Sequence, residues 1–286
     1  MKKLLIHLHV YYHEQLSYFL QKIGNICNVD YDLYVTMHQH NPAAESKVLA
    51  FFPDAKILIV ENRGYDVGAF VEVLNHVNLA KYDYVLKLHT KKNTGSQLLE
   101  INKSRIARRY WSRMLIEALI DTPQIWLKNL QILAANSKVG MIAAKKLITS
   151  ETASYEDIKD RVVKTVSDFG FSPLQSIRFV AGTMFLIRAE LLKPLQQARY
   201  SMADFEIPDP KQGNNSLAHV MDRVFGAMVE AQNHTIYGQR YMSFSTAIGN
   251  ILARIRHFIY YKKNSNGVLH IKIFGLPVWR KKEKIG

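Results

Sequence analysis

The residues that could do chemistry in this chain gather in two polar segments, each directly after an apolar stretch. Residues 61–68, ENRGYDVG, follow the apolar KILIV, and residues 89–95, HTKKNTG, follow the apolar YDYVLKL. Positive charge at the end of a buried strand is costly without a partner. The two segments could together hold an anionic ligand such as a nucleotide diphosphate, through Arg63, Asp66, His89, Lys91 and Lys92, with Lys87 of the preceding apolar run.

Glycines in the first segment favour the same interpretation. Gly64 and Gly68 would allow a ligand to approach the backbone closely, and a helix over 67–77 would point its N-terminus at an anion. The spacing matches neither the Walker loop nor the dinucleotide-binding loop. The alternative is a plain turn beside a pair of solvated lysines.

Metal-binding patterns are weak in this sequence. No Asp-x-Asp pair lies near the end of a predicted strand, and no HExxH spacing occurs among the eleven histidines. The pairs His7/His9 and His38/His40 are each spaced by two, which is more typical of structural histidines than of metal ligands. We therefore expect no metal ion or other cofactor, although magnesium and manganese stay open.

Alternating patterns predict the elements that must position these residues. Strands are predicted over 3–10, 31–37, 56–60 and 82–88, with helices over 14–26, 43–51 and 67–77 between them. Such alternation predicts an α/β fold with a mainly parallel sheet flanked by helices. In such sheets ligands bind beyond the carboxyl ends of the strands, where both polar segments lie.

The rest of the chain continues with the same element types. We predict mostly helix over 104–135, with Pro123 in a first turn, and then a strand over 138–144. After a surface excursion over 150–176, the sequence predicts one strand over 178–188 around Gly182. The remaining predictions are a helix over 189–198, a loop over 208–215 and a helix over 216–231.

Composition separates a body from a basic tail. The 286 residues suit one large domain, and the single cysteine, Cys27, excludes an internal disulfide framework and fits a reducing cytosol. Of the net charge of +14, residues 250–286 carry +8, from nine Lys/Arg and Glu283. We divide the chain into a body, 1–249, and a C-terminal segment, 250–286.

The tail pattern predicts a basic amphipathic helix, an Asn266–Gly267 turn and a short pair of strands. Such a segment suits an anionic membrane surface, and no apolar run reaches the length of about 18 residues that a spanning helix needs. The N-terminal MKKLLIHLHVYY is interpreted as a strand and not as a signal peptide, because histidines interrupt it. The alternative for the tail is an ordinary packed C-terminus with a solvated basic end.

Four segments in order, ENRGYDVGAF, YDYVLKLHTKKN, FVAGTMFLIR and LAHVMDRVFG, resemble the rhamnan synthesis protein F family of bacterial polysaccharide glycosyltransferases. The resemblance covers roughly residues 4–235. It implies a GT-A-like Rossmann-type fold and transfer of a sugar, with rhamnose one candidate, from a dTDP- or UDP-sugar. The acceptor would be a growing cell-surface polysaccharide or lipopolysaccharide, free or lipid-linked, at the inner face of the plasma membrane.

The same resemblance implies roles for individual residues. The loop from Asn62 to Asp66, which includes Arg63 and Gly64, would lie by the donor. Gly182 and Thr183 would face the donor sugar and acceptor, together with Arg223. In metal-dependent GT-A enzymes the strand corresponding to 82–88 ends in carboxylates that hold a cation. Here it ends in HTKK, so fixed cations could stabilise the departing nucleoside diphosphate instead.

An inverting transfer needs one base to take a proton from the acceptor hydroxyl. The candidates are Asp222, Glu206 and His219, in that order. The chain has Asn214–Asn215 and Asp222–Arg223 where the family usually has Asp-Gly and Glu-Arg, which leaves the base open. Asp222–Arg223 could instead be a surface ion pair, and His219 could be a packing residue.

Two other classes of function compete. A nucleic-acid binder would fit the pI near 9.7, but no motif of that class occurs, and charge at buried strand ends suits a small ligand better. We therefore expect no nucleic-acid partner. A non-catalytic module that binds a sugar nucleotide or a glycan is the second alternative, and it would bind the nucleotide without turnover.

Overall fold

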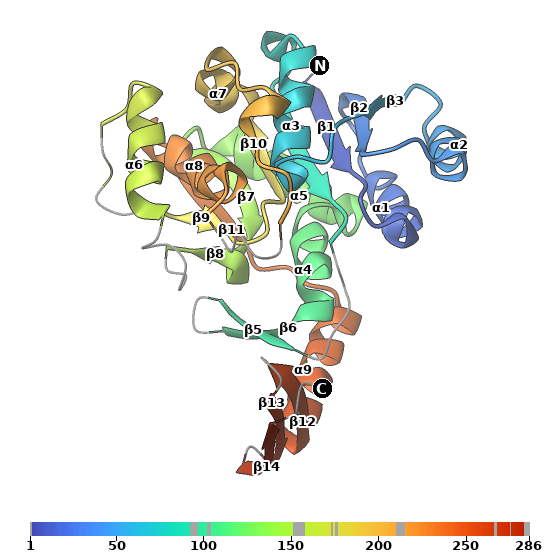
Figure 1. Ribbon diagram of the computed structural model, residues 1–286. Coiled ribbons are helices and arrows are strands. Elements are labelled where there is room, and N and C mark those ends of the chain that lie inside the picture. The colour runs from blue at the N-terminus through green and yellow to red at the C-terminus, as the bar shows by residue number, and fades with distance from the viewer. Residues whose placement is uncertain are drawn as a thin grey trace.

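A seven-stranded sheet forms the centre of the protein (Figure 1). The computed structural model describes residues 2–91, 97–101, 104–150, 158–172, 174, 177–209, 215–265, 268–274 and 276–282. The strand order is β11-β7-β10-β4-β1-β2-β3. Strand β10 runs antiparallel to both of its neighbours, and the other pairs are parallel. The predicted α/β fold with a mainly parallel sheet is confirmed. In chain order the strands are β1 (Lys3–His9), β2 (Asp30–Met37), β3 (Lys56–Ile59), β4 (Tyr84–His89), β7 (Val139–Ala144), β10 (Phe185–Arg188) and β11 (Thr235–Gln239).

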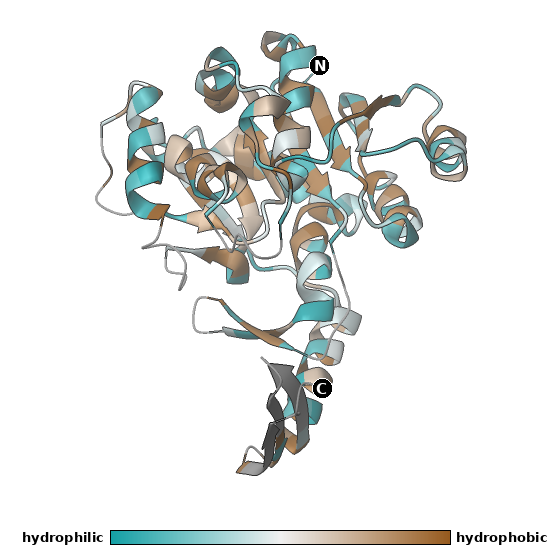
Figure 2. Cartoon of the chain, in the orientation of Figure 1, coloured by the Kyte–Doolittle hydropathy of each residue, from teal (hydrophilic) through white to brown (hydrophobic). Residues whose placement is uncertain are grey.

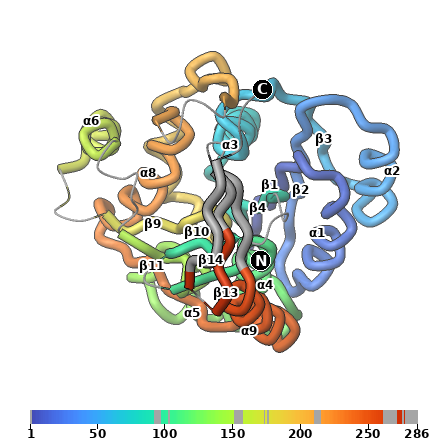
Figure 3. Tube along the Cα trace, turned by 60° about the horizontal axis from the view of Figure 1, so that its bottom comes forward, coloured from blue at the N-terminus to red at the C-terminus, as the bar shows by residue number. Residues whose placement is uncertain are grey.

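Helices cover both faces of the sheet. Helices α3 and α8 pack together on one face, and α1, α4 and α5 lie together on the other (Figures 1 and 3). The helices of the body are α1 (Leu16–Ile23), α2 (Pro42–Phe51), α3 (Tyr65–His76), α4 (Arg108–Ile120), α5 (Pro123–Ala135), α6 (Lys159–Asp168), α7 (Lys193–Gln197) and α8 (Leu217–Ala231). Short 3-10 turns are η1 (His13–Gln15), η2 (Leu79–Lys81), η3 (Lys145–Leu147), η5 (Ala189–Leu192) and η6 (Met202–Asp204).

The central strands β4 and β7 are buried at every position, and most of the central sheet carries hydrophobic residues (Figure 2). Strands covered by helices on both sides are mostly apolar runs. Strands β1 and β4 follow this pattern but also bury His7, His9, Lys87 and His89. In the parallel register of β1 and β4, His9 is paired with His89. The carboxyl ends of these two strands therefore meet at one edge of the sheet.

The single strand predicted over 178–188 is wrong: the chain forms two short strands in different sheets. Strand β9 (Phe179–Val180) pairs with β8 (Ile148–Thr149), whereas β10 joins the central sheet. Between them the backbone turns left-handed, with φ of 102° at Gly182 and 47° at Thr183. A left-handed β-branched residue is strained, and such strain is often found at functional sites.

The start of the helical region predicted over 104–135 is also wrong. Strands β5 (Leu98–Ile101) and β6 (Ser104–Ala107) form an antiparallel hairpin, and α4 begins only at Arg108. The helix starts there because the backbone of Ala107 is extended, and its N–H donates to Asn250 Oδ1 at 2.8 Å. Pro123 stands in the first turn of α5, as predicted.

The C-terminal segment projects from the body as a helix and a small sheet (Figure 1). Helix α9 (Phe244–Ile259) leads into an antiparallel sheet of β12 (Tyr260–Ser265), β13 (Val268–Ile273) and β14 (Leu276–Lys282). The sheet has three strands where a pair was predicted, and residues 249 and 250 both lie inside α9. Within the described ranges, no helix is long and apolar enough to cross a membrane.

Some predictions fall outside the described residues. These are Lys92 of the polar segment 89–95, Asn214 and the Asn266–Gly267 turn. Parts of the loop over 208–215 and of the excursion over 150–176 also lie outside. Within that excursion the structure describes α6.

Candidate functional site

A cavity of about 590 Å³ opens at the carboxyl edge where β1 and β4 end. Its walls come from the segments after these strands and from the first turns of α3, α4 and α8, which converge there (Figure 1). Asn62, Asp66, His89 and Lys91 all line it. The two polar segments that the sequence singled out therefore meet at one edge, as predicted.

Asp66, in the first turn of α3, is the electrostatic centre of the cavity. Its Oδ2 accepts hydrogen bonds from Thr183 Oγ1 at 2.8 Å and from Lys87 Nζ, and lies 3.2 Å from His89 Nδ1. Burial alone would raise the pKa of Asp66, but the neighbouring His89 and Lys87 hold it well below the usual carboxyl range. Asp66 is therefore an anion at neutral pH.

Lys87 is the buried partner of this anion. Its side chain is 0% exposed, and Nζ also donates to Thr183 O at 3.1 Å. The rings of Phe70, Phe185 and Phe225 surround the ammonium, with centroids 5.6 to 6.0 Å from Nζ. Lys87 thus lies behind Asp66 and is not among the residues that line the cavity. The charge of Lys87 is therefore balanced by the Asp66 carboxylate and not by a ligand in the cavity.

Lys91 and Arg108 form a cationic wall of the cavity. Lys91 Nζ lies 4.1 Å from the ring centroid of Trp111, which is a cation–π contact. The Gln15 side-chain amide donates to Lys91 O at 2.6 Å and accepts from Lys91 N at 3.1 Å. Burial lowers the pKa of Lys91, against the attraction of Asp66 and Asp222. Arg108 is the first residue of α4, and its Nε is buried without a hydrogen-bond partner in the described part of the chain.

Asp222, near the start of α8, lines another wall of the cavity. Burial raises its pKa to about 7, and the negative charge of Asp66 adds to this effect, while Arg223 opposes it. Arg223 Nη1 lies 3.6 Å from Asp222 Oδ2 and donates to His219 O at 2.9 Å. A carboxyl group with a pKa near neutrality is suited to act as a general base.

His219 lines the same wall. Its Nδ1 lies 2.6 Å from Ser216 Oγ, the N-cap of α8, and its ring packs edge-on against Tyr65 at 5.7 Å. Burial lowers its pKa, and Arg223 lowers it further, so the imidazole is neutral at pH 7. His219 therefore packs against Tyr65 and also lines the cavity.

Glu206 and Arg63 do not line the cavity, and both form hydrogen bonds with other parts of the chain. The Glu206 carboxylate accepts from Leu217 N at 2.9 and 3.1 Å, at the N-terminus of α8, where a negative charge is favourable. Arg63 pairs with Glu61 at 2.8 Å and donates to Phe205 O at 3.1 Å. The structure gives both residues a role in holding the loops around the cavity.

Two glycines shape the site without lining the cavity. Gly64 has φ of 62°, and an added Cβ would lie 2.5 Å from the Phe205 ring. At Gly182 an added Cβ would lie 3.1 Å from Trp111, whose ring makes the cation–π contact with Lys91. Any other residue at either position would displace a neighbour that packs against the cationic wall or against the loop over 62–66.

Several lining residues were missed from the sequence: Tyr11, Tyr12, Arg108, Trp111 and Asp209. The tyrosines carried a signal, because they directly follow the first strand and so had to reach the same edge. Tyr11 is 41% exposed and stacks on His38 with ring centroids 5.0 Å apart. Arg108 and Trp111 carried none, because only the folding of the hairpin before α4 brings them to the cavity.

The histidine pair of the first strand has a structural partner. His7 Nε2 and His9 Nδ1 lie 2.9 and 3.0 Å from the hydroxyl oxygen of Thr36 on the neighbouring strand. Burial lowers the pKa of His9, which lines the cavity, to about 4. Among the residues that the structure describes, no group of three or more His, Cys, Asp and Glu is placed to hold a metal ion.

Comparison with known proteins identifies related sequences. The model of the family described as rhamnan synthesis protein F matches residues 1–234. Two relatives, both described as uncharacterized protein WxcX, come from Xanthomonas campestris pv. campestris strains B100 and ATCC 33913. They are 30% and 29% identical over 180 residues, which is 62% of this chain. The matched region spans 24% of each relative, so the chain corresponds to about a quarter of their length.

Solved structures with a similar course of the chain are more distant in sequence. The mannosyltransferase PcManGT from Pyrobaculum calidifontis, in complex with GDP-Man and Mn²⁺, has 13% identity and a TM-score of 0.38. The alignment covers 84% of this chain and 55% of that one. TarS residues 1–349 from S. aureus has 10% identity and a TM-score of 0.42, with 85% and 59% covered.

Proposed function

The chain belongs to the rhamnan synthesis protein F family, and we propose that it is a glycosyltransferase of bacterial polysaccharide synthesis with a GT-A-like fold. The observation that carries the proposal is the polarised cavity at the carboxyl edge of the sheet. One wall holds Lys91 and Arg108, and another holds Asp222, whose pKa is raised to about 7. A cationic wall suits a diphosphate leaving group, and a carboxylate base suits an acceptor hydroxyl.

The donor is a sugar joined to a nucleoside diphosphate, of the dTDP or UDP type. Its diphosphate lies against Lys91 and Arg108, and its base faces the exposed ring of Tyr11. Charge builds up on the diphosphate as the bond to the sugar breaks. Cations held in place before the reaction stabilise that charge without reorganising, which is the largest contribution in many enzymes.

The transfer is inverting in this proposal. Asp222 takes the proton from the acceptor hydroxyl, whose oxygen attacks the anomeric carbon while the bond to the diphosphate oxygen breaks. The electron pair of that bond leaves with the nucleoside diphosphate. Asp66 stays ionised beside Lys87 and keeps the Asp222 carboxyl basic through repulsion. Thr183 is buried outside the cavity lining and bonds to Asp66, so it holds that carboxylate in place and does not face the sugar, and His219 and Arg223 position Asp222.

Finer features complete the proposal. Rhamnose is the proposed sugar, and the acceptor is a growing cell-surface polysaccharide or lipopolysaccharide carried on a lipid. The chain works in the cytoplasm at the inner face of the plasma membrane, where its +8 C-terminal segment meets anionic lipid.

A screen of nucleotide sugars against thermal unfolding tests donor binding. A ligand at a hundred times its dissociation constant stabilises the folded state by about 2.7 kcal/mol, so the correct donor should raise the melting temperature by several degrees. Release of nucleoside diphosphate with a glycan acceptor then tests turnover. Donor binding without turnover under any acceptor would identify a non-catalytic binding module instead, and no shift with any donor would contradict the proposal.

Removing either wall cation should weaken diphosphate binding selectively. We expect Lys91→Ala and Arg108→Ala each to reduce the affinity for the nucleoside diphosphate by about 1.5–3 kcal/mol, the size of a charge-assisted contact. The affinity for the nucleoside should stay the same, as measured by calorimetry. Arg63→Ala is the matched control, because its guanidinium bonds to Glu61 and Phe205 outside the cavity lining. Equal losses for both ligands would contradict the assignment of the cationic wall.

Transfer should not depend on a divalent cation. If Lys91 and Arg108 stabilise the leaving diphosphate, activity in EDTA should stay within about twofold of the activity in magnesium or manganese, since fixed cations already supply the charge. Initial rates measured after dialysis against EDTA check this expectation. Loss of activity that manganese or magnesium restores would show that a metal ion carries the diphosphate.

A further inference from the structure

Helix α9 turns its polar side to the body and its apolar side to solvent, the reverse of an ordinary surface helix. Thr246 and Asn250 are 0% and 5% exposed, and Ala253 and His257 continue the same side at helical spacing. The opposite side is exposed and apolar. It consists of Phe244, Ile248, Ile251, Leu252, Ile255 and Phe258.

Polar contacts fix this orientation. The buried carboxylate of Glu117 on α4 accepts from Thr246 Oγ1 at 2.7 Å and from Ser243 N at 3.0 Å. Asn250 Oδ1 accepts from Ala107 N at 2.8 Å, at the start of the same helix. Since these groups are buried and satisfied, the helix cannot roll its apolar side inward without leaving them unpaired, which is costly. The apolar side is therefore held outward.

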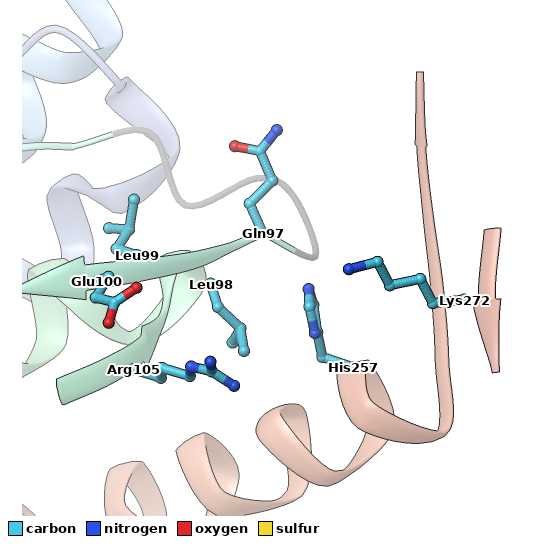
Figure 4. Close-up of a pocket in the computed structure, with 7 residues that line it drawn as sticks. All are labelled: Gln97, Leu98, Leu99, Glu100, Arg105, His257 and Lys272. Carbon is cyan, nitrogen blue, oxygen red and sulfur yellow. The ribbon is translucent and has the colours of Figure 1, made fainter. Parts of the chain in front are cut away.

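Beside this apolar side lies a cationic cleft. Arg105 of β6, His257 of α9 and Lys272 of β13 point into the space between the β5–β6 hairpin and α9 (Figure 4). Burial lowers the pKa of His257, and repulsion by Arg105 and Lys272 lowers it further. The three groups thus come from three separate elements, and an anion among them would offset the repulsion between the charged Arg105 and Lys272.

The apolar side and the cleft belong to one surface. A hollow of about 620 Å³ is lined by Arg105, Lys272 and Arg254 together with Ile251, Ile255 and Phe258. It adjoins the hollow of about 320 Å³ that Figure 4 shows, which Glu100 and Gln97 also line. Cationic groups beside apolar groups match the phosphate of a lipid headgroup with its acyl chains alongside.

We infer that α9 docks on an anionic bilayer with its apolar side among the acyl chains and a lipid phosphate seated between Arg105, His257 and Lys272. This inference rests on the proposed attachment of the chain to the membrane. It assigns that attachment to the apolar side of α9 and to the three residues of the cleft. A second copy of the chain is the alternative occupant of an apolar surface. Charge complementarity favours the lipid, because a second copy would bring the same basic residues to the contact.

The test uses the full chain and vesicles of phosphatidylcholine with or without phosphatidylglycerol. Each basic residue near the surface adds roughly fivefold to partitioning, so Arg105→Ala/Lys272→Ala should bind the anionic vesicles about 25-fold more weakly. Lys47→Ala/Lys193→Ala removes the same charge from exposed sites on α2 and α7, and should change binding less than about twofold. Leu252→Ser/Ile255→Ser should weaken binding in the same way, because it removes the apolar contact.

Three results would overturn the inference. Equal weakening by the two charge-matched double variants would show attraction by net charge alone. Binding of inorganic phosphate to the cleft without vesicle binding would identify a site for a free anion. A dimer of the wild type without lipid, dissociated by Leu252→Ser/Ile255→Ser in light scattering, would identify a second copy as the occupant. Nucleotide-sugar binding by these variants reports separately on the proposed transfer, since its cavity lies at the sheet edge.

Discussion

Asp222→Asn should lower the rate of sugar transfer by about 10²–10⁴-fold, the usual contribution of a general base. The amide cannot take a proton from the acceptor hydroxyl, but it keeps the size and polarity of the carboxyl group. The affinity for the donor should therefore stay within about threefold, because the proposed diphosphate site is formed by Lys91 and Arg108 and not by Asp222. Steady-state kinetics with a glycan acceptor, together with donor calorimetry, measures both quantities.

The pH profile gives an independent reading of the same residue. Burial raises the pKa of Asp222 to about 7, and Asp66 adds to the shift. A base works only when deprotonated, so the rate for the wild type should fall as the pH drops through about 7. Asp222→Asn should lose this step.

Glu206→Gln is the matched control for Asp222. It removes a charge at the N-terminus of α8, where Glu206 accepts from Leu217 N, and should cost about 1 kcal/mol of stability. Transfer per folded molecule should stay unchanged. If Glu206→Gln abolishes transfer while Asp222→Asn retains it, Glu206 is the base.

Asp66→Ala should lower the free energy of unfolding by about 3–5 kcal/mol, the cost of breaking a buried ion pair. The substitution leaves the ammonium of Lys87, which is 0% exposed, without its carboxylate among three phenylalanine rings. Urea denaturation followed by far-UV circular dichroism measures the loss. Asp66→Ala/Lys87→Met should recover most of it, since methionine fills the aromatic cage without a charge.

The stability of the wild type should also depend on pH in the acid range. Since the folded state depresses the pKa of Asp66, its contribution is present above the usual carboxyl pKa of about 4 and is lost as the pH falls below it. The Asp66→Ala/Lys87→Met variant should lose less stability on acidification. A single variant no less stable than the double would contradict the buried ion pair.

Hydrophobic pattern alone predicted much of the fold. The alternation over the first 90 residues reproduced β1 to β4 and the helices between them within a few residues, because the strands of such a sheet are mostly apolar runs and the intervening helices have apolar residues at helical spacing. The same reasoning failed at 178–188. There a mostly apolar pattern hides a left-handed turn at Gly182 and Thr183, where Trp111 and Leu115 from a distant helix pack closely against the glycine.

The candidate site shows the same division at the level of single residues. The ends of β3 and β4 could be placed at one edge because parallel strands share their direction, so Asp66, His89 and Lys91 were expected together. Lys87 was grouped with the donor-binding residues, yet it lies behind Asp66. Its position in the strand does not reveal whether a ligand or a carboxylate of the chain balances its charge.

The sequence by itself determined the α/β class, the edge at which polar groups collect and the basic character of the tail, since these follow from periodicity and composition. Tertiary structure alone decided which charges face a ligand and which face each other. It paired Lys87 with Asp66, brought Arg108 and Trp111 to the cavity and turned the apolar side of α9 outward. The reason is that a pKa or an exposed face depends on distances between residues far apart in the chain, which no local pattern encodes.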